Sequence, residues 1–513
     1  MKRWTGMLFI LILSLAVTVA CSSGGTKSSD QPTPASASDK KTNPPATSAK
    51  PTQKDWGSVT AIYKSHPSAP FKDNWLIWDI YREKAGVQIK PSAYPGQFWE
   101  AWELTLASGN LPDMMYVEPS RRANKAGQDG FLLDLNKYMD KMPNFKKWLD
   151  KNPDYYKLLV DSEGALYMTP NPGAYSQLDS SFFYREDIFK KHNLKTPTNY
   201  TEFLDVMREL KKLYPDSYPF VFDGWAPGLL SASFNTSRDW IYDTKKKDWV
   251  YGPATDEYKE LVTFIATAYK EKLIAPDFLT MKSEQRNELI YNNKAFIQSA
   301  YLDNLDGWLA VGRKTDPNYT WSSMIPPAGS NGGAFNSYAA MYEMGMTVTA
   351  DAKNKEGAFH LIDWHFTEEG KEAVSWGKEG VTYSIVDGKK KMNGITNALE
   401  LTNKYGIRAN GTELWFDSDV VNSLMSPDTK KAFDVAVKYL APPQVAPKFN
   451  AAENEKMSLI QTAIGKYAEE NVSKFMIGKR PMSEWNDYVD GLNKLGMKDI
   501  HDIHVTASNR AKK

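Results

Sequence analysis

The sequence predicts an α/β fold built around a parallel sheet. Segments 59–63 and 87–90 alternate like strands, and segments 72–85 and 98–106 have helical spacing. The apolar run 114–117 adds a third strand. Strand, helix, strand, helix, strand is typical of parallel strands joined by crossover helices. The composition agrees, because 42% hydrophobic and 24% charged residues are usual for a globular protein.

The same alternation returns further along the chain. Asn199 can cap a helix with Glu202 three residues later. Region 430–500 is mostly helical in pattern. The other predicted strands are 181–184, 219–222 and 295–298, and the other predicted helices are 199–213, 255–273 and 353–367.

The first twenty residues have the form of a secretory signal peptide. A basic start precedes the apolar run 7–20, which is shorter than the roughly 20 residues of a comfortable membrane-spanning helix. Cys21, the only cysteine, follows and resembles the cysteine of a bacterial lipobox, although Thr18 stands where lipoboxes usually carry Leu. The alternative is an ordinary cleaved signal with an incidental cysteine. We expect cleavage before Cys21 and lipid on its sulfur.

Segment 21–55 is expected to tether the folded body to the membrane. After Cys21 it has no aromatic residue and no Ile, Leu, Val or Met, so it cannot bury enough surface to fold. As a coil it would average about 30–35 Å end to end. We therefore expect a lipid-anchored protein on the outer face of the cell membrane.

Charge and motif content exclude several classes of function. The 63 basic and 62 acidic residues leave no electrostatic footprint for nucleic acid. Without its first 20 residues, the chain has a net charge of −1, since Lys2 and Arg3 are lost. The chain has no G-x-S-x-G, G-x-G-x-x-G, P-loop or H-E-x-x-H motif, so we expect no enzyme activity and no cofactor.

The histidines do not predict a metal site. His360 and His365 are five residues apart and would not share a helical face. His501 and His504 could share one, but they lie near an end of the chain that we expect to be mobile. No carboxylate–histidine pattern surrounds either pair, so we interpret both as surface or packing residues.

Several short segments have a recognisable order and spacing. They are Ser108-Gly-Asn-Leu-Pro-Asp113, Gly130-Phe-Leu-Leu-Asp-Leu135, Gly164-Ala-Leu-Tyr-Met-Thr-Pro170, Phe183-Tyr-Arg-Glu-Asp-Ile-Phe189 with Leu194-Lys-Thr-Pro-Thr198, Asn293-Lys-Ala-Phe296, Lys353-Asn-Lys-Glu-Gly-Ala358, and Phe475-Met-Ile-Gly-Lys-Arg-Pro481 with Trp485. Together they resemble bacterial extracellular solute-binding proteins of the sugar-binding group, over about residues 57–500. Within that group, they look most like the long lipoproteins that serve oligosaccharide uptake in Gram-positive bacteria.

The resemblance implies a two-lobed, periplasmic-binding-protein-like fold with three inter-lobe crossovers and a helical C-terminal region. By analogy the crossovers fall near 178–183, 335–341 and 380–386. Lobe 1 would then comprise 56–180 and 341–382, and lobe 2 would comprise 181–340 and 383–513. The resemblance also implies an oligosaccharide held between the lobes and delivered to an ABC transporter permease in the membrane. We expect a monomer.

One departure from the family concerns calcium. Many long relatives carry an Asp/Asn/Gly-rich calcium loop after the helix that follows a Pro-Thr pair, which here is Pro197-Thr198. Here that place is Leu213-Tyr-Pro-Asp-Ser-Tyr-Pro-Phe220, which offers only the side chains of Asp216 and Ser217. A hard cation needs several oxygen ligands, so we predict no metal there.

Aromatic and polar residues after predicted strands are the candidate ligand contacts. Ligands of parallel α/β sheets bind at the carboxyl ends of the strands, and sugars favour aromatic platforms with a few polar groups. Most of the 65 aromatic residues must nevertheless belong to the core. The candidates are Tyr94, Glu118, Arg121, Gln128, Trp225, Tyr301, Trp376, Tyr383 and Trp415.

Two other functions remain open at this stage. One is a lipid-anchored glycosidase, because 62 carboxylates always include some possible acid/base pair whose separation the sequence cannot give. The other is a sensor lipoprotein that uses the same cleft without a permease. A binding protein would return labelled oligosaccharides intact, and permease genes beside this one would favour transport over sensing.

Overall fold

The structure, a computed structural model, describes residues 54–66, 69–173, 180–222, 228, 230–302, 304–330, 333–338 and 343–511. All structural statements below concern these residues. Among them, no helix combines the length and the apolar character needed to cross a membrane.

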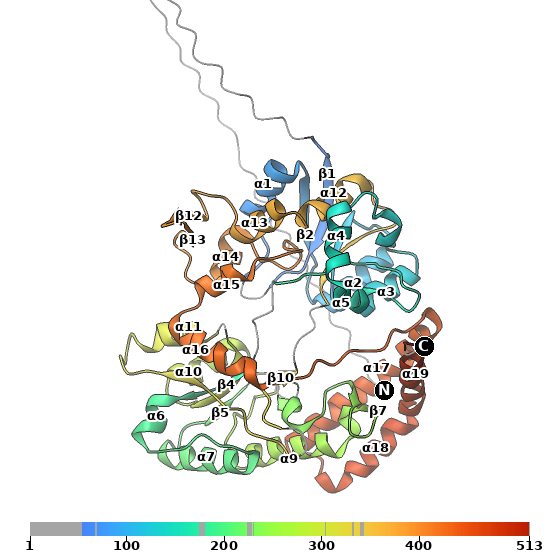
Figure 1. Ribbon diagram of the computed structural model, residues 1–513. Coiled ribbons are helices and arrows are strands. Elements are labelled where there is room, and N and C mark those ends of the chain that lie inside the picture. The colour runs from blue at the N-terminus through green and yellow to red at the C-terminus, as the bar shows by residue number, and fades with distance from the viewer. Residues whose placement is uncertain are drawn as a thin grey trace, which may run out of the picture. The chain divides into compact units, whose positions relative to one another are not determined.

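A four-stranded sheet forms the centre of lobe 1 (Figure 1). Its strands are β1 (Ser58–Tyr63), β2 (Gln88–Ala93), β3 (Met114–Val117) and β11 (Gly345–Val348), in the order β11-β3-β1-β2. β1 pairs in parallel with both β2 and β3, and β11 runs antiparallel to β3. The predicted parallel arrangement of the first three strands is therefore confirmed.

Helices pack against this sheet and share one hydrophobic core with its strands. The predicted helix 72–85 is α1, which continues as a π-helical turn at Tyr81–Ala85 and ends at Gly86 in the left-handed conformation. The helices of this lobe are α1 (Leu76–Ile80), α2 (Phe98–Ser108), α3 (Ser120–Gln128), α4 (Pro143–Lys151), α5 (Pro153–Leu159), α12 (Lys355–His365), α13 (Glu368–Trp376), α14 (Ala398–Tyr405) and α15 (Ser418–Leu424). The hairpin of β12 (Tyr383–Val386) and β13 (Lys389–Met392) lies between α13 and α14 in the chain.

Lobe 2 has its own four-stranded sheet, in the order β5-β8-β4-β9. The strands are β4 (Ser180–Arg185), β5 (Phe220–Val221), β8 (Ile297–Tyr301) and β9 (Trp321–Met324). β5 and β8 are parallel, but β4 runs antiparallel to both of its neighbours. The parallel pattern predicted from sequence therefore holds only for one pair here.

Helices predicted for lobe 2 form with the expected caps. The side chain of Asn199 accepts a hydrogen bond from the backbone of Glu202 at 2.9 Å, as the sequence predicts. The helices are α6 (Glu186–Lys191), α7 (Tyr200–Leu213), α9 (Asp256–Lys270), α10 (Ser283–Tyr291), α11 (Asn304–Gly312), α16 (Pro427–Ala436), α17 (Ala451–Met476), α18 (Trp485–Lys494) and α19 (Met497–Ala511). A separate hairpin joins β6 (Trp240–Asp243) and β7 (Asp248–Tyr251).

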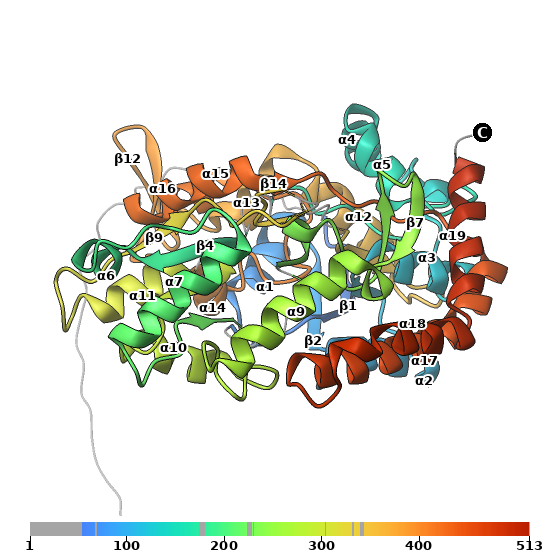
Figure 2. The same cartoon turned by 90° about the horizontal axis from the view of Figure 1, so that it is seen from below.

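The long helix α17 begins the helical C-terminal region. Asn450 and Glu453 form a capping box at its start, which satisfies two backbone donors that the first turn leaves open. α17 packs against α9, and α19 packs against α17 and β7 (Figure 2). α19 is thus part of the lobe 2 core, and the expectation of a mobile end was wrong for it.

The hydrophobic cores show where the chain changes lobe. The first change falls between Met168 and Phe182, and the second between Met324 and Met346. Within the second change, β10 (Ser337–Tyr338) pairs with β14 (Leu440–Ala441).

The third change of lobe does not fall near 380–386. Tyr383 is buried in the lobe 1 core, and so are the apolar side chains up to Val421. Ala432 is the next buried side chain to join a lobe 2 core. The hairpin β12–β13 and helices α14 and α15 therefore belong to lobe 1, and the expected boundary at residue 383 was wrong.

Candidate functional site

In both lobes, the carboxyl ends of sheet strands lie beside the place where the chain enters from the other lobe. In lobe 1, Gly345 begins β11 opposite Val117, which ends β3. In lobe 2, Ser180 begins β4 opposite Tyr301, which ends β8. Chain segments that arrive from the other lobe therefore enter each sheet beside the carboxyl ends of its strands. Those ends are where α/β sheets bind ligands.

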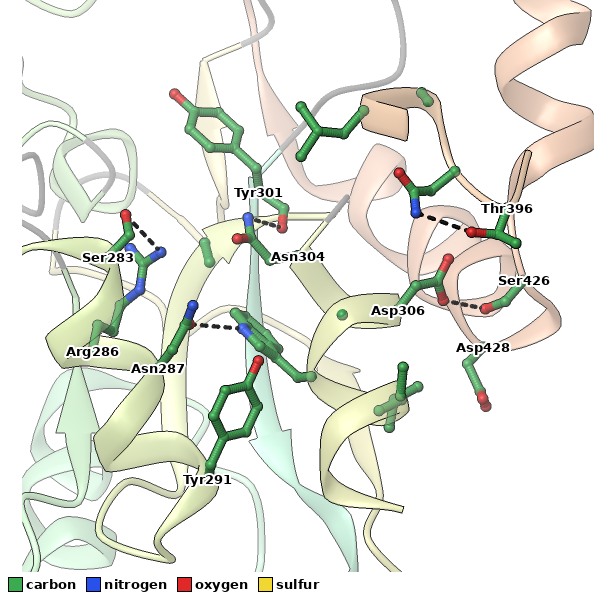
Figure 3. Close-up of a pocket in the computed structure, with 18 of the residues that line it drawn as sticks. Ser283, Arg286, Asn287, Tyr291, Tyr301, Asn304, Asp306, Thr396, Ser426 and Asp428 are labelled. Atoms are coloured by element: carbon green, nitrogen blue, oxygen red, sulfur yellow. Dashed lines mark hydrogen bonds between the residues drawn. The ribbon is translucent and has the colours of Figure 1, made fainter. Parts of the chain in front are cut away.

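A cavity of about 1060 Å³ lies at this junction and is lined from both lobes. Lobe 1 contributes His66 and the segment 396–399, and lobe 2 contributes residues of α10, β8, α11 and the start of α16. Figure 3 shows side chains from these elements around the cavity. Its volume is at the upper end of the range of small-molecule sites.

Tyr301 is the most open aromatic side chain of the cavity wall. It ends β8 and is 51% exposed, which is unusual for so large an apolar ring. The backbone carbonyl of Tyr301 accepts a hydrogen bond from Asn304 Nδ2 at 3.1 Å, which fixes the start of α11 (Figure 3). The sequence places Tyr301 after a strand at 295–298; in the structure the strand extends to Tyr301, which lines the cavity. Its contact with a ligand stays a prediction.

One wall of the cavity is an ordered polar network between α11 and α16. Asp306 accepts hydrogen bonds from the hydroxyls of Ser426 and Thr429, the latter at 2.7 Å. Arg313 pairs with Asp428 at 2.9 Å. These carboxylates are already held in place, so they present oriented acceptors to a ligand at little entropic cost.

The opposite wall comes from α10. Asn287 Oδ1 accepts a hydrogen bond from Trp308 Nε1 at 3.3 Å, which orients the amide toward the cavity (Figure 3). Arg286 is 6% exposed and donates to Ser283 Oγ at 3.5 Å. Burial raises the pKa of Tyr291, the last residue of α10, so its hydroxyl is a neutral donor and acceptor.

On the lobe 1 side, the cavity is lined by the capped N-terminus of α14. Asn397 accepts from the backbone N–H of Glu400 at 2.9 Å, and the Glu400 carboxylate accepts from the backbone N–H of Thr396 at 2.9 Å. Thr396 and Asn397 therefore meet the cavity from a rigid turn. Hydroxyl, amide, carboxylate and aromatic groups around one cavity suit a ligand with many hydroxyl groups and apolar C–H faces.

Three aromatic candidates from the sequence lie in the lobe 1 core instead. The Tyr94 hydroxyl donates to the backbone carbonyl of Tyr116 at 2.9 Å, and Tyr94 is buried. Trp376 donates to Asp417 at 3.0 Å and packs edge-on against Tyr383. All three side chains are buried, so the prediction that they face a ligand was wrong for this conformation.

Tyr383 and Trp415 show why local sequence misled the assignment. The Tyr383 hydroxyl donates to Glu372 at 2.9 Å, and burial together with this bond raises the pKa of Tyr383 to about 12. Trp415 is half-buried, its ring 6.4 Å from Phe366 and 6.3 Å from Trp148, with the Lys371 ammonium 4.9 Å away. Trp415 therefore packs within lobe 1.

The polar candidates of lobe 1 lie at its edge beside lobe 2. Glu118 accepts hydrogen bonds from the ammonium of Lys64 and the hydroxyl of Tyr116. Arg121 is half exposed and lies 3.9 Å from Asp239 of lobe 2. Both stay candidate ligand contacts, because both lie near the carboxyl end of β3.

Gln128 belongs to a clasp between the lobes. Its Nε2 donates to Asp161 at 3.2 Å and to the backbone carbonyl of Phe449 at 3.3 Å, and its Oε1 accepts from Asn454 at 3.1 Å. Lys448 donates to the backbone carbonyl of Leu158. We call this group of five residues, Gln128, Asp161, Lys448, Phe449 and Asn454, the inter-lobe clasp. Gln128 thus holds lobe 2 rather than lining the cavity.

Two candidates lie outside the described residues. They are Trp225, a candidate ligand contact, and Cys21, the predicted lipid attachment site. Both stay predictions.

The histidines behave as packing residues where the structure describes them. His365 is buried, and this burial lowers its pKa to about 3. His360 stacks on Trp56 at 4.1 Å, and His504 stacks on Trp240 at 4.7 Å. Within the described ranges, no three His, Cys, Asp or Glu side chains come together in a way that could hold a metal ion.

The positively charged side chain of Lys211 contacts the loop at 213–220. The Lys211 ammonium donates to the backbone carbonyl of Ser217 at 2.6 Å and lies 5.2 Å from the ring of Tyr218. Burial lowers the pKa of Lys211, while nearby Asp216 opposes that change. The absence of calcium from this loop stays a prediction.

Sequence reasoning missed most of the cavity wall. Asn287 and Arg286 lie on α10, a helix without strong amphipathic spacing, and Thr396 and Asn397 come from a part of the chain assigned to the other lobe. The capping pattern Thr396-Asn-Ala-Leu-Glu400 repeats that of Thr198-Asn-Tyr-Thr-Glu202. This pattern marks a rigid helix start, but it does not show that the helix meets a cavity.

Comparison with known proteins agrees with this geometry. The model of the family "Bacterial extracellular solute-binding protein" matches residues 68–372, which is more than half of the chain. The chain belongs to this family. It is therefore an extracellular solute-binding protein and not an enzyme, which confirms the resemblance inferred from sequence and excludes the glycosidase alternative.

Individual relatives are distant but cover nearly the whole chain. The fructooligosaccharide ABC transporter substrate-binding protein FusA of Streptococcus pneumoniae is 23% identical, over 97% of this chain and 96% of its own. The crystal structure of the alginate-binding protein AlgQ2 without calcium superimposes with a TM-score of 0.77 at 20% identity, over 89% of this chain and 99% of that one. FusA in complex with kestose gives 0.71 at 19% identity, over 89% and 100%. The structural matches show the two-lobed fold.

Proposed function

We propose that this protein captures an oligosaccharide between its two lobes and delivers it to an ABC import permease. The observation that carries the proposal is the cavity of about 1060 Å³ between the lobes, beside the carboxyl end of β8, with the open ring of Tyr301 near fixed amides and carboxylates. Stacking on an aromatic ring and hydrogen bonds to hydroxyls are how proteins hold sugars. The similarity to FusA, a fructooligosaccharide ABC transporter substrate-binding protein, supports an oligosaccharide ligand and an ABC transporter partner.

Calorimetry with kestose, a human milk oligosaccharide and an alginate oligosaccharide tests the proposal. At least one should bind, and chromatography should recover it intact. Tyr301→Ala should then weaken binding by about 1–3 kcal/mol, in the range of lost aromatic contacts, without lowering Tm much. The matched control is Tyr383→Ala, which should cost about 3–5 kcal/mol of stability because that ring is core. Unchanged affinity with a large fall in Tm for Tyr301→Ala would contradict the assignment.

The proposal includes a lipid anchor on Cys21. It is supported by the lone cysteine after a signal-like run and by the linker composition of 22–55. Cys21→Ala should release the protein from membranes into the medium. If this variant fractionates with membranes at the level of the unmodified protein, the chain has no lipid anchor at this position.

A further inference from the structure

A second group of side chains gathers at the carboxyl edge of the lobe 1 sheet. Lys64 follows β1, Trp99 lies in the first turn of α2 after β2, and Glu118 follows β3. Because β1, β2 and β3 are parallel, all three residues lie at one edge of the sheet. That edge is the junction of the lobes, since Ser120 donates a hydrogen bond to Glu343 in the second connecting segment.

Trp99 is held in place while part of its ring stays open. The indole is 40% exposed, although its neighbours on the buried face of α2 are core residues. Phe98 packs edge-on at 4.8 Å, the Arg122 guanidinium carbon lies 4.7 Å from the ring centroid, and Lys64 Nζ lies 5.5 Å from it. An oriented, partly exposed tryptophan at a ligand-binding edge can gain binding energy by burying its remaining face.

The charges around this ring cancel. Arg122 pairs with Glu103 at 2.9 Å, and Lys64 pairs with Glu118. The cluster thus offers two cationic donors and two anionic acceptors with no net charge. Hydroxyl groups both donate and accept, so this arrangement suits a neutral ring with several hydroxyls better than a ring that carries a carboxylate.

We propose that Trp99 forms a second sugar subsite, on lobe 1, that takes a neutral ring of the oligosaccharide. Lys64 and Glu118 would face the hydroxyl edge of that ring, and Arg122 keeps the indole in position. None of these four residues lines the cavity beside Tyr301, so the subsite is separate from it. The inference rests on the proposed function and adds the charge class of the ligand.

The test compares Trp99→Ala with Leu104→Ala, which removes another exposed apolar side chain from the same helix. Kestose supplies a neutral probe, and an alginate oligosaccharide supplies a charged one. We expect kestose to bind the unmodified protein more tightly than alginate does. Trp99→Ala should weaken kestose binding about tenfold, while Leu104→Ala leaves it unchanged. In protein labelled with 5-fluorotryptophan, the ¹⁹F signal that Trp99→Phe removes should shift when kestose is added.

Several results would overturn the inference. Tighter binding of alginate than of kestose would reject the neutral class. Unchanged kestose affinity of Trp99→Ala, or a fixed ¹⁹F signal, would reject the subsite, while a loss of affinity in Tyr301→Ala would leave the proposed function intact. If the unmodified protein binds no sugar, both proposals fail together.

Discussion

At the scale of single residues, Glu413 is an acidic side chain buried in lobe 1. Its side chain is fully buried, and Thr412 donates a hydrogen bond to Oε2 at 3.0 Å. Thr412 is itself held by the hydroxyl of Tyr81, which donates to its backbone carbonyl. Burial raises the pKa of Glu413 to about 8, so the folded protein keeps this carboxyl protonated near neutral pH.

Replacing Glu413 by Gln should remove a pH dependence of stability. In the unfolded chain the carboxyl loses its proton near its ordinary value of 4.5, but in the folded protein only near 8. The stability that it contributes is therefore complete below about pH 4.5 and is lost as pH rises through 8. Urea unfolding at pH 5 and pH 8.5 should show a fall in unfolding free energy on the order of a few kcal/mol that Glu413→Gln reduces. Equal falls in Glu413→Gln and in the exposed control Glu379→Gln would contradict this assignment.

The same scale shows what sequence could and could not predict of the site. Spacing placed Tyr301 after a strand, and that strand formed at β8. Tyr94 also follows a predicted strand, but its hydroxyl donates to the carbonyl of Tyr116, 22 residues later in the chain, and the ring is buried. Both tyrosines look alike in sequence. Long-range contacts separate them, and no local pattern encodes those contacts.

At the scale of elements, α19 is fastened to the hairpin β6–β7 by three side chains. Trp249 donates to Ser508 at 2.6 Å, and His504 stacks on Trp240. His501 Nε2 lies 3.0 Å from Asp248 of the hairpin. Partial burial alone would lower the pKa of His501, but its bonds to Asp502 and Asp248 raise it above the ordinary value of 6.5.

His501 should therefore strengthen this attachment at acidic pH. A histidine with a raised pKa in the folded state contributes stability that is complete below pH 6.5 and is lost as pH rises through the folded value. His501→Ala should lower Tm more at pH 6 than at pH 8.5. Asp248→Asn should remove most of the pH 6 effect, because it removes the hairpin carboxylate. Hydrogen exchange in α19 would report the same loss locally, and a pH-independent difference in Tm would contradict the role of protonation.

The elements themselves were largely predictable, since strands β1, β2, β3, β4 and β8 and helices α2, α7, α9 and α12 follow the periodicity of the sequence. The lobe boundary was not. A crossover was expected at 380–386, but the hairpin β12–β13 begins there. The hydrogen bond from Tyr383 to Glu372 holds this hairpin on lobe 1. The chain then adds α14 and α15 to the same core before it changes lobe. An inserted hairpin has the same alternation as a connecting strand, so pattern alone could not distinguish them.

At the scale of the whole two-lobed body, the inter-lobe clasp and the cavity lie at different places along the junction. The clasp joins α3 to the start of α17 and the segment just before it, and the cavity is lined by residues of α11 and the start of α14. Figure 1 shows α3 and α17 on the other side of the molecule from α11 and α14. Lys448 is half-buried in the clasp, and this burial lowers its pKa although Glu343 and Asp161 oppose the change. Desolvated contacts of this kind form only when the lobes are close together.

Ligand binding should therefore close the lobes, and the clasp should favour the closed state. In solution scattering, the radius of gyration should fall when a bound oligosaccharide is added. Gln128→Ala removes hydrogen bonds worth about 0.5–1.5 kcal/mol each, so it should enlarge the ligand-free protein and weaken binding by several-fold. Arg208→Ala breaks contacts with Glu271 inside lobe 2 and should leave the radius and the affinity unchanged. An unchanged radius despite confirmed binding would count against a hinged cleft. A normal affinity in Gln128→Ala would make the clasp a contact without influence on closure.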